Sequence, residues 1–115
     1  MDVRLVQLLG SFITARSQYA LARLEFAMHF PDKPAPPLID RLADPSERTL
    51  REEWPVVEGQ LEEAVAYLKK VERSGRRDVK ADEGFRWLQR SIRELDQYAR
   101  AIRWVLTVSE SETER

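Results

Sequence analysis

A line of arginines in the last third of the chain has the residue types and the spacing to bind an anion. On a helix, one face would present six residues in steps of four and three: Arg86, Arg90, Arg93, Gln97, Arg100 and Trp104. At 3.6 residues per turn, these six fall within about 40° of one line. Guanidinium groups bind phosphate and carboxylate oxygens in paired hydrogen bonds, and an indole ring stacks on bases. The line therefore predicts a surface for an acidic protein or a nucleic-acid backbone, extended at its start by Arg76 and Arg77.

The same line has a second interpretation, a solvated helix face whose arginines pair within the chain. Three acidic residues stand four positions from an arginine, in the pairs Asp82–Arg86, Arg90–Glu94 and Asp96–Arg100. Each such pair stabilises a helix by about 0.3 kcal/mol. The glutamates of the preceding helix could neutralise the other arginines, so the sequence leaves both interpretations open.

The net charge of −1 hides an uneven distribution of charge along the chain. Residues 1–43 carry +1 and residues 44–72 carry −4, whereas residues 73–103 carry +4 and residues 104–115 carry −2. Blocks of opposite sign either pair within the fold or bind separate partners.

Two further arginines, Arg16 and Arg23, interrupt an apolar helix face in the first third of the chain. A buried arginine needs an acceptor, because an unpaired charge is too costly to bury. We expect these seam arginines to pair with glutamates of the next helix and so to fix the register between the two helices. Two alternatives are that their alkyl stems pack on aromatic rings with the heads in water, and that they bind a ligand or a partner chain.

Arg23 and His29 have the spacing R-x5-H, which resembles the residue pair of the HEPN family of helical ribonucleases. The resemblance implies a dimer in which the arginine and the histidine act on RNA at the interface. The sequence departs from the family pattern, because Leu24 stands where a polar residue is usual and the pair lies on the first long helix. The spacing also sets the two side chains about 120° apart on a regular helix. The ribonuclease is therefore our third hypothesis.

The first of the elements that must position these residues is a helix over residues 3–30. Its apolar face repeats in steps of four and three, with the seam arginines in the gaps: Leu5, Leu9, Phe12, Tyr19, Phe26 and Phe30. Pro31 ends the helix, because the residue before a proline is pushed out of the helical region. Five of the six prolines then fall in residues 31–45, so we predict a Pro-rich connector over residues 31–44.

A second helix is predicted over residues 45–74. Asp44 is the expected cap, Pro45 suits the first helical position and Glu47 completes an acidic capping box. Pro55 lies inside the helix, and because the apolar rhythm keeps its phase across it, we predict a kink. A break into two helices at Trp54 is the alternative.

A third helix is predicted over residues 79–108, after Gly75 ends the second helix and Asp78 caps the third. Residues 110–115 are expected to fray. The fold class is all-α, an elongated antiparallel bundle of three long helices in one domain over residues 1–109. Slender bundles of this kind often complete their core against another chain.

Composition excludes several classes of function. The chain has no cysteine and one histidine, and its four glycines are scattered, so we expect no cofactor, no metal site and no catalytic residues. No apolar run is long enough to cross a membrane, and we expect a cytoplasmic protein. The leading hypothesis is a non-catalytic interaction protein, a homodimer or a small subunit of a larger assembly. The alternative is a subunit that binds RNA or DNA backbone, similar in size and helix content to the small helical subunits of CRISPR effector complexes.

Overall fold

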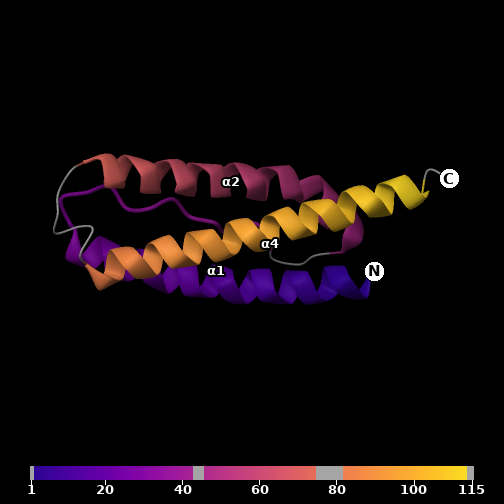
Figure 1. Ribbon diagram of the computed structural model, residues 1–115, viewed down its shortest axis with the longest axis horizontal. Helices are drawn as coiled ribbons and strands as arrows, with labels where there is room; N and C mark the ends of the chain where they lie inside the picture. Colours follow the sequence, from indigo (N-terminus) through magenta and orange to yellow (C-terminus); the bar gives the residue numbers. More distant parts are fainter. Residues whose placement is uncertain (1, 43–45, 75–81, 114–115) are drawn as a thin grey trace.

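The computed structural model describes residues 2–42, 46–74 and 82–113, with side chains as far as Ser109 (Figure 1). They form three α-helices: α1 (Val3–His29), α2 (Glu47–Arg73) and α4 (Glu83–Thr113). No β-strand occurs among the described residues. The molecule is elongated, with its long dimension more than twice either of the others. The prediction of an elongated all-α bundle is therefore confirmed.

Helix α1 begins where the sequence analysis expects, and a local hydrogen bond explains its start. Asp2 caps the helix, because its Oδ1 accepts a hydrogen bond from the backbone N–H of Arg4 at 2.8 Å. The Arg4 guanidinium beside Asp2 also lowers the pKa of that carboxyl below its ordinary value. The helix ends at His29, two residues before Pro31, as expected for a helix that meets a proline.

Helix α2 runs without a break through Pro55, so the alternative of two helices at Trp54 is wrong. Its cap differs from the prediction. The Ser46 side chain accepts a hydrogen bond from the backbone N–H of Thr49 at 3.2 Å, and the helix begins at Glu47. The predicted cap Asp44 and first residue Pro45 lie outside the described residues.

Helix α4 begins later than predicted and extends farther. Oδ1 of Asp82 accepts hydrogen bonds from the backbone N–H of Gly84 at 2.7 Å and of Phe85 at 3.4 Å, which places the helix start at Glu83. The helix then continues to Thr113, beyond the predicted end at residue 108 and into the tail that was expected to fray. The predicted stop at Gly75 and cap at Asp78 lie outside the described residues.

The three helices pack unequally. Helix α1 lies closely along α4, and α2 also packs on α4, but no Cα of α1 comes within 8 Å of a Cα of α2. Large side chains span the wider gap. The Phe12 and Trp54 rings meet edge to face with centroids 5.4 Å apart, and Phe26 and Tyr67 do the same at 6.2 Å.

The connector, residues 31–42, returns along the gap between α1 and α2 (Figure 1). After a turn at residues 31–33 it has no regular secondary structure, and three of its side chains are buried: Pro36, Ile39 and Leu42. Leu42 has φ 78°, a left-handed conformation that costs a leucine on the order of 1 kcal/mol. Burial of the Leu42 side chain, which is 1% exposed, offsets that strain. The connector thus packs alongside the helices as a fourth, non-helical segment of the bundle.

Candidate partner-binding surface

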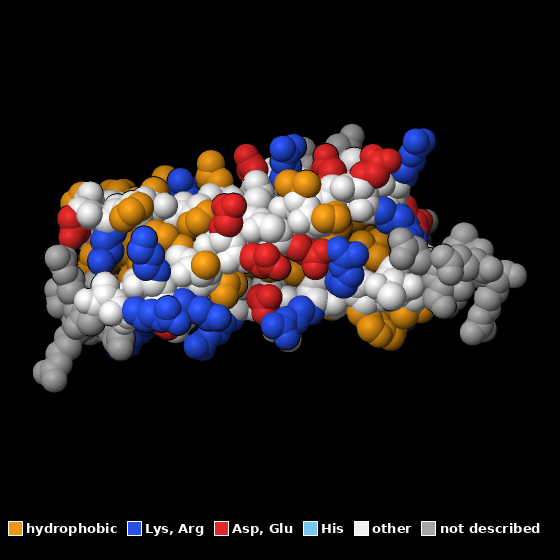
Figure 2. All heavy atoms as spheres, turned by 90° about the horizontal axis from the view of Figure 1, so that it is seen from above, with side chains coloured by type: hydrophobic (Ala, Val, Ile, Leu, Met, Phe, Trp, Pro, Cys, Tyr) orange, Lys and Arg blue, Asp and Glu red, His pale blue; other side chains and the backbone are white. Residues whose placement is uncertain are grey.

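The outward side of α4 carries three of the predicted site residues, Arg86, Arg90 and Arg93, which we call the basic face. Their side chains are exposed because the apolar residues on the opposite side of α4 are buried: Phe85, Leu88, Ile92, Leu95, Ala99 and Ile102. Figure 2 shows blue side chains gathered toward the end of the molecule at which α4 begins, whereas red and blue side chains alternate nearer its middle. The basic face places three positive charges within about two turns of α4.

The guanidinium groups of the basic face form no hydrogen bond or ion pair with any residue that the structure describes. Two of the three predicted i,i+4 pairs are absent. The Asp82 carboxylate is used as the cap of α4 instead of binding Arg86, and Arg90 makes no ion pair with Glu94. The predicted neutralisation within the helix therefore fails for these three arginines.

The far end of the predicted line differs from its start. Arg100 Nε lies 3.1 Å from Asp96 Oδ2, so the third predicted pair is formed. Trp104 is 58% exposed, and the Arg4 guanidinium lies 5.7 Å from the centroid of its ring. The predicted line is thus divided in two. Arg100 and Trp104 have partners within the chain, whereas the basic face has none among the described residues.

The glutamates of α2 do not cover the basic face. Glu58 forms an ion pair with Arg103, which lies beside the predicted line and not on it. Glu72 accepts a hydrogen bond from the Gln89 side chain at 2.9 Å. The two predicted extensions of the surface, Arg76 and Arg77, lie outside the described residues.

A hollow of about 390 Å³ lies beside the basic face. Its lining mixes charges of both signs with one half-buried indole: Glu25, Glu83, Arg86, Trp87 and Arg90. Trp87 packs against the apolar core. Two carboxylates beside two guanidiniums make this hollow a poor site for a polyanion and a better one for a surface that carries both charges.

The seam arginines find backbone acceptors in the connector. Arg23 Nε donates to the carbonyl oxygen of Pro36 at 2.5 Å. Arg16 donates from Nη1 to the carbonyl of Arg41 and, at 3.4 Å, to that of Leu42. The predicted pairing of these arginines with α2 glutamates is wrong, because the connector lies between the two helices and offers unpaired carbonyls at the seam.

Two tyrosines hold the connector in the same way from both sides of the gap. Tyr19 of α1 donates to the Pro37 carbonyl at 2.5 Å, and Tyr67 of α2 donates to the Pro34 carbonyl at 2.6 Å. Burial raises the pKa of Tyr19 to about 12 and also raises the pKa of Tyr67. Both phenols therefore keep their protons, and their hydrogen bonds, well above neutral pH.

The residue pair that resembles the HEPN ribonucleases is not brought together by any contact. Arg23 is bound to the Pro36 carbonyl. His29 is exposed, and its Nε2 lies 3.9 Å from Glu25 on the preceding turn. No hydrogen bond or ion pair joins the arginine and the histidine, so this chain alone presents no such paired site.

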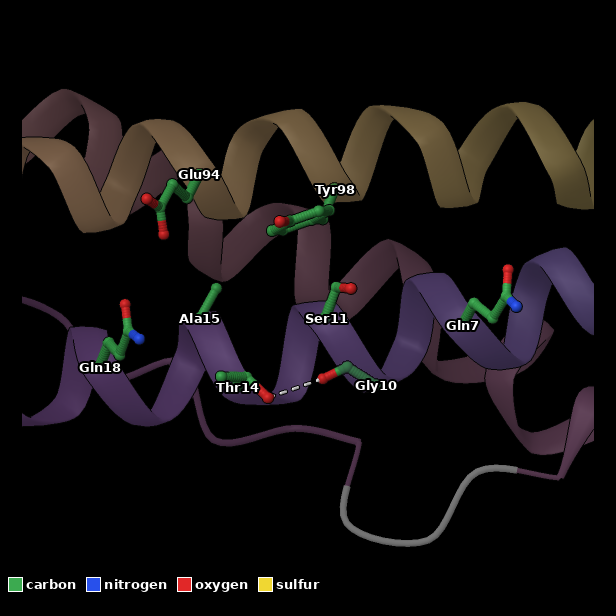
Figure 3. A pocket seen from close by; sticks show the side chains of 8 residues that line it. All are labelled: Gln7, Gly10, Ser11, Thr14, Ala15, Gln18, Glu94 and Tyr98. Atoms are coloured by element: carbon green, nitrogen blue, oxygen red, sulfur yellow. Dashed lines mark hydrogen bonds between the residues drawn. The ribbon is translucent and has the colours of Figure 1, made fainter.

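A second hollow, which the sequence analysis did not identify, lies between α1 and α4 (Figure 3). It measures about 620 Å³ and is lined by small and polar residues: Gln7, Gly10, Ser11, Thr14, Ala15, Gln18, Glu94 and Tyr98. In Figure 3 the Tyr98 ring lies between the two helices, facing Ser11 and Ala15. The small residues of α1 leave the space, and their clustering is the sequence signal that could have located it.

Neither a metal site nor a membrane span is found in the part of the chain that the structure describes. Its histidine, aspartate and glutamate side chains form no group of three or more that could hold a metal ion. None of its helices combines the length and the apolar character needed to cross a membrane.

Comparison of the chain with protein-family models, with curated proteins and with solved structures gives no match. The chemistry of the surface is therefore the basis for a proposed function.

Proposed function

We propose that this protein is a non-catalytic interaction protein, a small helical subunit that binds an acidic surface of a partner protein through the basic face. The observation that carries the proposal is the exposure of Arg86, Arg90 and Arg93 without a partner among the described residues. Three like charges lie within about 11 Å of helix length, at 1.5 Å per residue. Arginines four and three positions apart repel one another, so the isolated chain carries a cost that an acidic partner would remove.

The charges beside the basic face favour a protein over a nucleic acid. Glu25 and Glu83 border the hollow that Arg86 and Arg90 line. A phosphate backbone would be repelled by both carboxylates, whereas a protein surface can place its own basic groups against them. Trp104, at the far end of α4, is an exposed aromatic of the kind that is enriched at protein interfaces.

The test compares two labelled probes, a peptide rich in Glu and Asp and a single-stranded RNA of equal net charge. Each is titrated with the protein and with a variant that combines Arg86→Gln, Arg90→Gln and Arg93→Gln, at about 50 and 200 mM salt. The matched control combines Lys69→Gln, Lys70→Gln and Arg73→Gln, which removes the same charge from exposed positions of α2.

We expect the peptide to bind, and the α4 variant to lose at least tenfold in affinity while the α2 control stays within about twofold of the parent. An equal loss of affinity in both variants would show that binding depends only on the net charge of the protein, and it would overturn the proposal. Tighter binding of the RNA than of the peptide, with a steep salt dependence that the α4 variant loses, would replace the protein partner with a nucleic-acid backbone.

A further inference from the structure

The outer face of α1, which points away from the core, is apolar at both ends and exposed along its length. Val3 is 70% exposed, Met28 is 80% exposed, and Leu21 and Leu24 are each more than half exposed. This face lies about 180° around the helix from the buried face, at 100° per residue. Figure 1 shows α1 along one edge of the bundle. Nothing in the described fold therefore accounts for this apolar surface.

The outer face follows a seven-residue repeat over the whole helix. Two positions of the repeat contain, in order, Val3, Gly10, Ser17 and Leu24, and Gln7, Thr14, Leu21 and Met28. All eight residues are exposed. The buried Leu5, Phe12, Tyr19 and Phe26 share this period, so what distinguishes the outer face is that its apolar members, Val3, Leu21, Leu24 and Met28, lie on one exposed stripe, the geometry by which a helix packs along a second helix.

The middle of the outer face is small, and its polar atoms are already satisfied. Thr14 Oγ1 donates to the carbonyl of Gly10 at 3.0 Å, and Ser17 Oγ donates to the carbonyl of Ile13 at 3.1 Å. A Cβ at Gly10 would meet no atom within 4 Å, so this chain alone gives no steric reason for a glycine there. Burial of this region would cost no hydrogen bond and would leave room for a large side chain from outside.

We propose that the outer face of α1 binds the same face of a second copy of this chain, with the two helices antiparallel. The face is complementary to its own reverse at Gly10 and Leu21, because its smallest residue then meets a bulky residue of the other copy. When each residue is set against the one whose number makes the sum 31, Leu21 of one copy enters the space over Gly10 of the other. Thr14 then lies against Ser17, and Val3 against Met28.

The flanking residues support the antiparallel direction. On one flank the residue numbers of facing positions sum to 29, so Arg4 of each copy, which also pairs with Asp2 of its own chain, lies opposite Glu25 of the other, and Ser11 lies opposite Gln18. On the other flank, every residue is apolar: Val6, Ile13, Ala20 and Ala27. A parallel pair would set the flank with Arg4 and Glu25 against the apolar flank of the other copy, and it would press Leu21 on Leu21 while leaving Gly10 on Gly10 unfilled. Charge and shape thus select the same direction.

The length of the face sets the expected strength of the dimer. From Val3 to Met28 the contact spans about 38 Å of helix. A single helix pair of this length falls toward the low end of stable interfaces, so we expect dissociation in the micromolar range. The dimer does not depend on the proposed role of the basic face, and the two surfaces share only Glu25.

Sedimentation equilibrium over about 1 to 200 μM protein tests the dimer, since this range brackets micromolar dissociation. We expect a reversible monomer–dimer equilibrium that Leu24→Lys weakens at least tenfold. Val56→Lys is the matched control, because Val56 is an apolar residue of α2 that is 45% exposed. A monomer across the whole range, or a dimer that Leu24→Lys leaves intact, would overturn the proposal.

Disulfide trapping tests the relative direction of the two helices. Because the chain has no natural cysteine, only the introduced thiols can form a disulfide. One chain carrying Gly10→Cys is mixed with one carrying Leu21→Cys under mild oxidation. We expect the mixed disulfide to form at least tenfold faster than the disulfide between two Leu21→Cys chains. The reverse order would establish a parallel pair and refute the antiparallel assignment. Circular dichroism of each variant confirms that the helices remain folded.

Discussion

Two pairs of arginines, each seven residues apart on a helix, have opposite fates in this protein. Arg16 and Arg23 on α1 donate to connector carbonyls, whereas Arg86 and Arg93 on α4 are exposed and have no partner in the described chain. The residue type and the spacing are the same in both pairs. What differs is whether another segment of the chain brings unpaired acceptors within reach. An arginine on a helix face therefore indicates that an anion or a carbonyl will bind it. The fold determines whether that acceptor belongs to the same molecule.

The largest expected effect comes from removing an arginine that is already bound. Arg23→Met keeps an apolar stem of similar length but leaves the carbonyl of the buried Pro36 without its donor. Because a hydrogen bond from a charged donor is lost, we expect the free energy of unfolding to fall by about 2 kcal/mol. Urea unfolding followed by circular dichroism measures the loss. A change as small as that of the matched variant Arg90→Met would mean that the connector contact contributes nothing to stability.

A smaller effect is expected at Tyr19, which binds the connector through a neutral donor. Tyr19→Phe removes one buried hydrogen bond and should lower the free energy of unfolding by about 1 kcal/mol. The same phenol gives a pH dependence whose sign is fixed by its pKa, which burial raises to about 12 in the folded chain. The stability that Tyr19 contributes is fully present below pH 10 and is lost as the pH rises from 10 toward 12, because only the unfolded chain ionises readily there.

Unfolding midpoints measured at closely spaced pH values between 9 and about 12 check this prediction. The parent should lose stability more steeply than Tyr19→Phe across that window, so the difference between the two proteins should shrink. A constant difference over the whole range would show that the Tyr19 phenol is not held in its neutral form by the fold.

The smallest effect is expected where the arginines are unpaired. Arg86→Met, Arg90→Met and Arg93→Met should each change the free energy of unfolding by no more than about 0.5 kcal/mol. The change should be toward higher stability at low salt, since each substitution relieves repulsion between like charges, and it should fade as salt is added. Thermal unfolding at two salt concentrations measures it. A loss of 2 kcal/mol in any one variant would reveal an internal partner and remove the case for a binding surface.

The helices and their buried faces were predictable because steps of three and four among apolar residues specify one side of a helix. The caps were less so. Ser46 and Asp82 cap α2 and α4, whereas the sequence analysis chose Asp44 and Asp78, because several residues near each helix start have side chains suited to the role. The periodicity of the apolar residues determines where a helix runs better than where it starts.

The connector path and its contacts were not predictable in the same way. A proline-rich segment has no periodicity to reveal which side of it is buried, and the acceptors for Arg16 and Arg23 are backbone carbonyls, which every residue has. The outer face of α1 was missed for a different reason. Leu21, Leu24 and Met28 stand beside the stronger apolar pattern that specifies the core, and Gly10, Thr14 and Ser17 interrupt the apolar character of their own face.

The way the connector is held has a consequence for how this sequence can change over time. Four side chains donate to its carbonyls, Arg16, Tyr19 and Arg23 on α1 and Tyr67 on α2, while the acceptors belong to the backbone and persist under almost any substitution. Tolerance to mutation should therefore differ between the connector and the residues that bind it. Exposed connector positions such as Ala35 and Leu38 can change with little penalty, whereas the four donors are constrained by contacts inside the molecule.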